Sequence, residues 1–123
     1  MSGGDFLLDT NIVLYLLSGE KKIAEVINHA QWHISFISEL ELLSFSSITS
    51  TEKEAIKKFI GRCRIIDINR EIKELAIQVR KSTKLPLPDS IIGATAIYME
   101  MPLFTADKDF KKIKSLPLIL FEA

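Results

Sequence analysis

The sequence has little of several features that would place it in other classes of protein. Only one of its 123 residues is a cysteine, Cys63, so the chain cannot form a disulfide within itself. A lone thiol fits a reducing compartment, and we expect Cys63 to be a buried packing residue beside Ile65 and not a catalytic group. No apolar run approaches the roughly 20 residues that a membrane helix needs. These absences predict a cytoplasmic protein that has no membrane span.

An excess of one charge is also absent. Sixteen basic residues balance sixteen acidic ones, so the formal net charge is zero. Domains that bind nucleic acid usually show a basic excess, and here any such affinity has to come from local clusters. Three groups of basic residues could supply it, although each could equally be the solvated face of a helix. They are Lys57, Lys58, Arg62 and Arg64; Arg80, Lys81 and Lys84; and Lys108, Lys111, Lys112 and Lys114.

The length of the chain fits one domain. Residues 1–4 have neither the positive charge nor the apolar core of a signal peptide, and we expect them to be a flexible lead-in. Residues 5–123 contain no repeat, linker or low-complexity stretch. With 47% apolar residues, they are able to fill one core. The prediction is a single domain over residues 5–123.

Strand and helix patterns alternate along this domain. Short apolar runs predict strands, whereas apolar residues at positions i, i+3, i+4 and i+7 predict helices. The predicted strands are 5–9, 32–36, 64–68, 103–105 and 118–121. The predicted helices are 11–17, 21–29, one that opens at Ser38, 51–62, 71–82, 89–100 and a short turn at 110–114. This alternation predicts a three-layer α/β/α sandwich around a mainly parallel sheet.

Two helix starts have the spacing of a capping box, in which a serine or threonine is followed three residues later by glutamate. They are Ser38 with Glu41, and Thr51 with Glu54. Residues 12–17 are apolar almost all round their predicted helix. Such a helix is buried or lies in an interface.

Four carboxylates from distant parts of the chain are expected at one edge of the sheet. Asp9 ends the first predicted strand, and Asp107 follows the strand 103–105. Glu41 and Asp89 lie near helix starts, which face the same edge as the strand ends. Carboxylates that converge repel one another unless a cation neutralises them. Hard oxygen ligands favour Mg²⁺ or Mn²⁺, which activate water for attack on phosphorus. The pattern therefore indicates phosphodiester hydrolysis.

Each of these acids also has an interpretation as a helix cap. Asp9 and Asp89 precede predicted helices, where a carboxylate accepts hydrogen bonds from free N–H groups. Asp109 stands before Phe110 in the same way, and Glu41 could simply be the partner of Ser38. Position at a helix start does not separate a cap from a catalytic acid.

Four segments, in order, resemble the motifs of PIN domains. They are Leu8-Asp9-Thr10-Asn11; Ile37-Ser38-Glu39-Leu40-Glu41-Leu42-Leu43; Leu87-Pro88-Asp89-Ser90-Ile91-Ile92-Gly93-Ala94-Thr95-Ala96; and Leu103-Phe104-Thr105-Ala106-Asp107-Lys108-Asp109-Phe110. Their order and spacing resemble the family over essentially the whole chain. In the third segment, Ser90 and Gly93 stand where the family often has alanine.

The resemblance implies hydrolysis of RNA by metal-activated water. It implies an acidic site for Mg²⁺ or Mn²⁺ made of Asp9, Glu41, Asp89 and Asp107, with Asp9 and Asp89 as direct ligands. It also implies that Thr10, Asn11 and Thr105 orient these carboxylates. Glu39 remains an alternative to Glu41, and Asp109 to Asp107.

Single-domain members of this size are often VapC-like toxins that a small antitoxin protein holds inactive. The resemblance therefore implies such a partner, and a homodimer in which the helix 12–17 lies at an interface.

Other functions fit the sequence less well. A phosphoacceptor receiver domain needs an acidic pair at the first strand end, but Thr10 and Asn11 follow Asp9 there. An aspartate-nucleophile phosphatase needs a second acid where Asn11 stands. A PIN-like module that binds RNA or protein without cutting remains open, as does a structural protein with well-capped helices.

Overall fold

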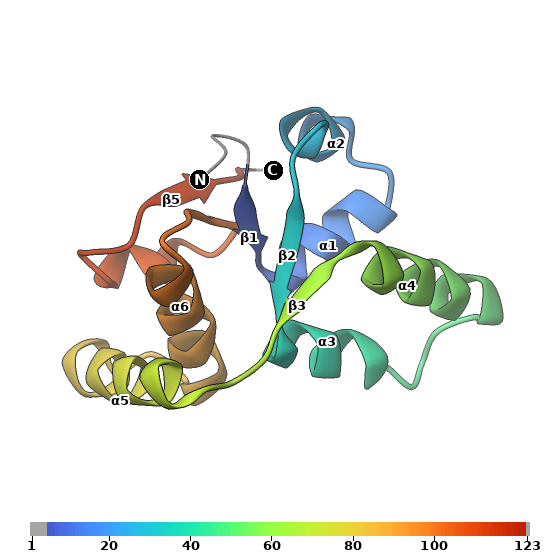
Figure 1. Cartoon of the computed structure of the whole chain (residues 1–123). Coiled ribbons are helices and arrows are strands. Elements are labelled where there is room, and N and C mark those ends of the chain that lie inside the picture. Colours follow the sequence, from blue (N-terminus) through green and yellow to red (C-terminus); the bar gives the residue numbers. More distant parts are fainter. Residues whose placement is uncertain (1–4, 123) are drawn as a thin grey trace.

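A computed structural model describes residues 5–122 of the chain (Figure 1). Residues 1–4, expected to be a flexible lead-in, and Ala123 lie outside the described part. The strands are β1 (Phe6–Leu8), β2 (Trp32–Ser35), β3 (Arg64–Ile66), β4 (Leu103–Thr105) and β5 (Leu118–Leu120). The helices are α1 (Thr10–Leu17), α2 (Lys21–Ile27), α3 (Phe36–Leu43), α4 (Ser50–Arg62), α5 (Arg70–Thr83) and α6 (Leu87–Met99), together with the 3₁₀ helix η1 (Lys108–Lys112).

The five strands form one parallel sheet in the order β3-β2-β1-β4-β5. β1 is the central strand, with Leu7 in register with His33 of β2 and Leu103 of β4. Because every strand runs the same way, the carboxyl ends of all five meet at one edge, where α/β sheets bind ligands. The prediction of a parallel sheet is confirmed.

Helices cover both faces of the sheet, as Figure 1 shows, with α1, α2 and α4 on one face and α5 and α6 on the other. The first face packs through a cluster that includes Leu8, Ile12 and Phe59, all buried. The second packs through a cluster that includes Leu7 and Ile92. Leu7 and Leu8 are adjacent in β1 and thus pack on opposite faces of the sheet, as the alternation of side chains in a strand requires. The predicted three-layer sandwich is confirmed.

α6 lies against the sheet through small residues. A Cβ atom at Gly93 would lie 2.6 Å from Cδ1 of Ile113, so glycine is what lets Ile113 approach the helix. Ser90 is fully buried and donates its hydroxyl hydrogen to the carbonyl oxygen of Leu85 at 3.2 Å. Residue 90 thus meets the segment before the helix, and residue 93 meets the end of the Ile113 side chain.

The helix caps differ from those predicted. α3 begins one turn earlier than expected, because Ser35 caps it by accepting a hydrogen bond from the backbone N–H of Ile37 at 3.1 Å. Ser38 therefore lies inside the helix, and the predicted capping box of Ser38 with Glu41 is wrong.

A capping box does open α4, but it is formed by Thr49 and Glu52 and not by Thr51 and Glu54. In α6 the N-cap is Pro86, without a side-chain hydrogen bond, and Asp89 belongs to the first turn of the helix. The interpretation of Asp89 as an N-cap is therefore wrong, and its carboxylate is free of that role.

α1 is buried on one side only. Ile12 and Val13 are inaccessible to solvent, whereas Leu14, Tyr15 and Leu17 are 36–39% exposed. Cys63 is half-buried, and burial raises the pKa of its thiol to about 12, which agrees with a packing role. No helix within residues 5–122 is long and apolar enough to span a membrane.

Candidate metal centre

Asp9 follows β1 and is held by two hydrogen bonds. Its Oδ1 accepts the backbone N–H of Thr10 at 2.9 Å, which caps α1, and its Oδ2 accepts the hydroxyl of Thr105 at 2.7 Å. The residue is only 6% exposed. Burial raises the pKa of Asp9 to about 6, and the hydrogen bonds from Thr105 and Thr10 only partly oppose this; the charges of Asp89 and Glu41 add to the rise. Asp9 is thus both a cap and a desolvated carboxylate.

Thr105, at the end of β4, joins Asp9 to Asp107. The hydroxyl oxygen that donates to Asp9 also accepts the backbone N–H of Asp107 at 3.0 Å. The carboxylate of Asp107 in turn accepts the N–H of Asp109 at 2.9 Å and caps η1. The expectation that Asp109 is the cap is wrong, because Asp107 fills that position.

Thr10 places Glu41 beside the same edge. Its hydroxyl lies 2.6 Å from Oε1 of Glu41 and 2.9 Å from the hydroxyl of Ser38, which is fully buried. Ser38 and Glu41 are three residues apart and so share a face of α3. Glu39 makes no side-chain hydrogen bond or ion pair within residues 5–122. The geometry therefore favours Glu41 over Glu39.

Asn11 fixes the turn after β4. Its side-chain oxygen accepts the backbone N–H of Ala106 at 3.2 Å, across 95 residues of sequence. Ala106 lies between Thr105 and Asp107, so Asn11 ties α1 to the segment that carries both residues.

Asp89 lies in the first turn of α6 and is half-buried. Desolvation raises its pKa, and the charges of Asp107, Glu41 and Asp109 raise it further, in that order. Asp89 and Asp9 also repel each other, since the charge of Asp89 raises the pKa of Asp9. The charges of Asp89 and Glu41 thus act on Asp9, and those of Asp107, Glu41 and Asp109 act on Asp89, which links the four predicted acids and Asp109 through Asp89.

The chemistry of these donors fits a hard divalent cation. Within residues 5–122, no group of three or more acidic, histidine or cysteine side chains lies close enough together to hold a metal ion. Mg²⁺ does not need such a group, because it keeps several waters and is bound through one or two carboxylates. Asp9 and Asp89 have raised pKa values, lie among other acids and form no ion pair with a base in the part of the chain that the structure describes. Such carboxylates are the kind of site that a cation stabilises.

Ser38 is the site residue that the sequence analysis misassigned. Its spacing from Glu41 was interpreted as a local cap, whereas the structure uses both residues to hold Thr10, from another helix. The sequence did carry a signal for this contact: the two residues share one helix face, and both belong to the second motif.

Comparisons with known proteins agree with this architecture. A family model described as "PIN domain" matches residues 6–116. A toxin–antitoxin complex from Klebsiella pneumoniae contains a chain that is 30% identical, with a TM-score of 0.82, covering 96% of this chain and 99% of that one. A comparison with curated protein sequences finds no match.

Two further solved structures have similar folds. VapBC-1 from nontypeable Haemophilus influenzae is 25% identical, with a TM-score of 0.82 and coverage of 94% of this chain and 97% of that one. DNA-bound VapBC from Salmonella typhimurium is 20% identical, with a TM-score of 0.84 and coverage of 94% and 96%, a likeness of fold alone.

Proposed function

This chain belongs to the PIN-domain family, and on that premise we propose that it is a cytoplasmic endoribonuclease that depends on Mg²⁺ or Mn²⁺ and acts as the toxin of a toxin–antitoxin pair. One observation carries the proposal: Asp9, 6% exposed and held by Thr105, shares the carboxyl edge of the sheet with acids whose charges raise its pKa. A bound Mg²⁺ or Mn²⁺ would supply an activated water and neutralise charge on the phosphate.

The residues of the proposed metal site would have different roles. Asp9 and Asp89 would hold the metal, and Glu41 and Asp107 would complete the acidic site. Thr105 holds the Asp9 carboxylate at 2.7 Å, which limits its rotation before a cation arrives. Thr10 does the same for Glu41 at 2.6 Å.

The second candidate is a PIN-like module that binds RNA or protein without cutting. Loss of one of the four acids would favour it, but this chain has Asp9, Glu41, Asp89 and Asp107. Such a module would also have no need for Asp9 and Asp89, two carboxylates whose pKa burial and neighbouring acids raise. The acids therefore favour the nuclease.

The deciding experiment is cleavage of a broad panel of RNAs by purified protein with Mg²⁺, with Mn²⁺ and with EDTA. An Asp9→Asn/Asp89→Asn variant is assayed beside it, with its fold checked by circular dichroism. Asp67→Asn is the matched control, because Asp67 is an exposed aspartate just after β3, the edge strand.

Cleavage that requires metal, survives Asp67→Asn and is lost in the folded double variant would support the nuclease and its site. If the wild-type protein cuts no RNA and binds neither metal, the carboxylates are structural and the proposal fails. Metal binding without cleavage of any RNA on the panel would support the metal centre but contradict the nuclease.

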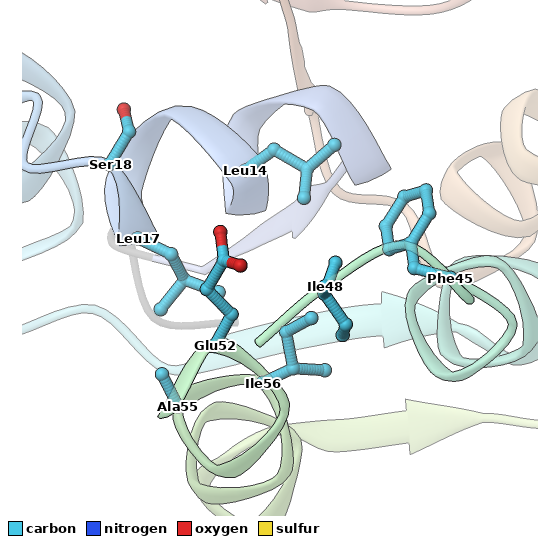
Figure 2. A pocket seen from close by; sticks show the side chains of 8 residues that line it. All are labelled: Leu14, Leu17, Ser18, Phe45, Ile48, Glu52, Ala55 and Ile56. Atoms are coloured by element: carbon cyan, nitrogen blue, oxygen red, sulfur yellow. The ribbon is translucent and has the colours of Figure 1, made fainter. Parts of the chain in front are cut away.

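An apolar groove supports the antitoxin part of the proposal. Figure 2 shows side chains of α1, α4 and the segment between α3 and α4 around a hollow of about 290 Å³. Leu14, Leu17, Phe45, Ile48, Ala55 and Ile56 supply its apolar lining, and Ser18 and Glu52 its polar edge. Because the similar structures are toxin–antitoxin complexes, we propose that an apolar segment of a small antitoxin fills this groove.

The test uses the protein encoded by any small open reading frame next to the gene for this chain. Leu17→Asp should prevent its co-purification, since a carboxylate would then have to be buried against apolar side chains. Ile77→Asp is the control, because Ile77 is 54% exposed on α5, away from the groove. Equal co-purification of wild type and Leu17→Asp would exclude the groove.

Homodimerisation stays a prediction. The exposed residues of α1 that suggested an interface include Leu14 and Leu17, which also line the groove. Light scattering on the purified chain, with and without its partner, would show whether a dimer forms and whether the partner displaces it.

A further inference from the structure

A second hollow lies at the carboxyl edge of the sheet, the edge that also carries Asp9 and Asp107. Its lining residues are Tyr15, Ala106, Lys108, Phe121 and Glu122, and its volume is about 380 Å³. β1, β4 and β5 are neighbouring parallel strands. Asp9, Ala106 and Phe121 come just after those three strands, so all three lie at the carboxyl edge.

The hollow and the candidate metal centre share one turn of the chain. Ala106, which lines the hollow, has Thr105 on one side and Asp107 on the other. The hydrogen bond from the Ala106 N–H to Asn11 holds this turn against α1. A ligand in the hollow would therefore lie next to the residues that position the carboxylates.

One wall of the hollow is a supported aromatic ring. Tyr15 is 36% exposed, and its ring centroid lies 5.2 Å from that of the buried Phe121, with the planes tilted by 58°. The backbone N–H of Phe121 donates to the carbonyl oxygen of Thr105 at 2.8 Å, which holds the backbone that carries the supporting ring. A ring held in this way loses little conformational entropy when a ligand packs on its free surface.

The rim of the hollow carries one cation that is only weakly engaged. Nζ of Lys108 lies 3.9 Å from Oε1 of Glu122, and the two side chains are 69% and 68% exposed. An ion pair this long and this exposed contributes little, so the ammonium can turn to a different anion. Glu122 would oppose an anionic ligand at the same rim.

We propose that this hollow is a subsite for one nucleotide of single-stranded RNA, next to the bond that is cut. The base stacks on Tyr15 and its phosphate binds Lys108, the combination by which proteins commonly hold single strands. The subsite rests on the proposed function only in naming the strand as substrate, because binding can be measured without cleavage.

The first experiment measures the affinity for a short, fluorescently labelled single-stranded RNA by anisotropy, in EDTA. All variants are made on the Asp9→Asn/Asp89→Asn background, which removes two repelling charges and prevents cutting. Tyr15→Ala should weaken binding about tenfold, the effect of losing one stacked base. Tyr15→Phe should bind like the parent because the ring remains. Tyr98→Ala should also bind like the parent, because Tyr98 is a 42% exposed tyrosine on α6, outside the hollow.

The charge on the rim gives a second, independent series. Lys108→Gln should weaken binding and reduce its dependence on salt, because one phosphate contact is lost. Glu122→Gln should strengthen binding, since it removes the opposing charge. Lys73→Gln, at an exposed lysine on α5 outside the three basic groups, is the control and should change neither.

Three results would overturn the subsite. Tyr15→Ala could bind as tightly as the parent, or Tyr15→Phe could bind as weakly as Tyr15→Ala with both folded by circular dichroism, or Lys108→Gln and Glu122→Gln could shift affinity in the same direction. If the parent binds RNA through Tyr15 but the wild-type protein never cuts, the nuclease proposal fails and the subsite stands. If the wild-type protein cuts and Tyr15→Ala cuts and binds equally well, the subsite fails and the nuclease stands.

Discussion

Thr105 and Asp9 are 96 residues apart in the sequence and share a buried hydrogen bond of 2.7 Å. The oxygen that donates to Asp9 also accepts the N–H of Asp107 at 3.0 Å. One fully buried hydroxyl thus positions two of the proposed metal ligands. Removing this hydroxyl should lower both the stability of the fold and the affinity for metal, and the two effects can be measured separately.

Thr105→Val should lower the free energy of unfolding by about 1–3 kcal/mol, because the Asp9 carboxylate and the Asp107 N–H each lose a buried partner. It should also weaken Mn²⁺ binding by about 10- to 100-fold, the usual effect of removing a group that orients a ligand. Urea unfolding and a metal titration measure the two. Thr105→Ser keeps the hydroxyl and should stay close to wild type in both. Unchanged metal affinity in Thr105→Val would remove Thr105 from the site.

The ionisation of Asp9 should make the metal-free protein less stable at neutral pH. Its folded-state pKa is about 6, against an ordinary value of 3.8, so the folded protein holds this proton more tightly than the unfolded chain. The stabilisation is therefore complete below pH 3.8 and is lost as the pH rises through about 6. At pH 7 the charged carboxylate costs about 3 kcal/mol. Asp9→Asn should unfold at higher urea concentration than wild type at pH 7 in EDTA, and the difference should shrink toward pH 4.

Added Mg²⁺ or Mn²⁺ should reverse the order of stability of the wild-type protein and Asp9→Asn. A cation that binds only the folded protein stabilises it in proportion to the logarithm of its concentration over Kd, and Asp9→Asn lacks a proposed ligand. The melting temperature of wild type should therefore rise with metal, while that of Asp9→Asn should stay nearly constant. Equal responses of the two proteins would contradict the assignment of Asp9.

An activity assay should distinguish the two acids of each nearby pair, Glu41 from Glu39 and Asp107 from Asp109. Glu41→Gln and Asp107→Asn should each lower RNA cleavage by about tenfold or more, since Thr10 holds Glu41 and Thr105 positions Asp107. Glu39→Gln and Asp109→Asn should leave it within about a factor of two, as surface substitutions usually do. A larger loss for either neighbour than for its partner would exchange their roles.

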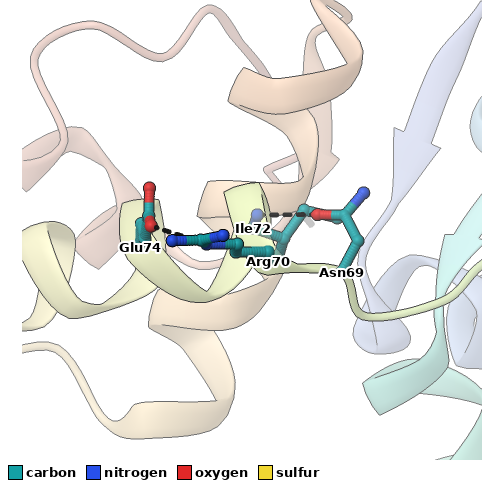
Figure 3. A network of polar contacts seen from close by, with 4 residues as sticks. All are labelled: Asn69, Arg70, Ile72 and Glu74. Carbon is teal, nitrogen blue, oxygen red and sulfur yellow. Dashed lines mark hydrogen bonds and ion pairs between the residues drawn. The ribbon is translucent and has the colours of Figure 1, made fainter.

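The start of α5 offers a comparison of a cap with an ion pair. Figure 3 shows Asn69, whose side-chain oxygen accepts the N–H of Ile72 at 2.8 Å, beside Arg70 and Glu74, whose charged groups lie 3.4 Å apart. Asn69→Ala should lower the free energy of unfolding by about 1 kcal/mol, because the helix loses its N-cap. Glu74→Ala should cost about 0.5 kcal/mol or less, since both partners are largely exposed. Urea unfolding of the two variants should show the cap as the stronger contact; the reverse order would contradict this.

The sequence predicted the sheet well and the helix starts poorly. The strand 103–105 was predicted at its observed bounds, because a buried parallel strand is a short apolar run whatever its neighbours are. At the start of α4, both Thr49 with Glu52 and Thr51 with Glu54 have the spacing of a capping box. The local sequence does not distinguish these two capping boxes, because the residue at which the helix begins depends on the path of the preceding loop.

The candidate site shows the same limit. The position of Asp9 and Asp107 after strands followed from the apolar pattern alone. The contact of Thr10 with Ser38 and Glu41 joins two helices about 30 residues apart, and only the packed structure shows it. Electrostatic coupling among the acids was expected from the topology, whereas the burial that raises the pKa of Asp9 required the coordinates.

The crossing from β1 to β4 has a consequence for synthesis of the chain. Asp9 is translated early, but its partner Thr105 belongs to β4, which pairs with β1 and is made only after all six α-helices. Chains are synthesised from the N-terminus, so an incomplete chain on the ribosome has Asp9 without Thr105 and without Asp107. The proposed metal site can therefore be complete only after β4 has emerged from the ribosome.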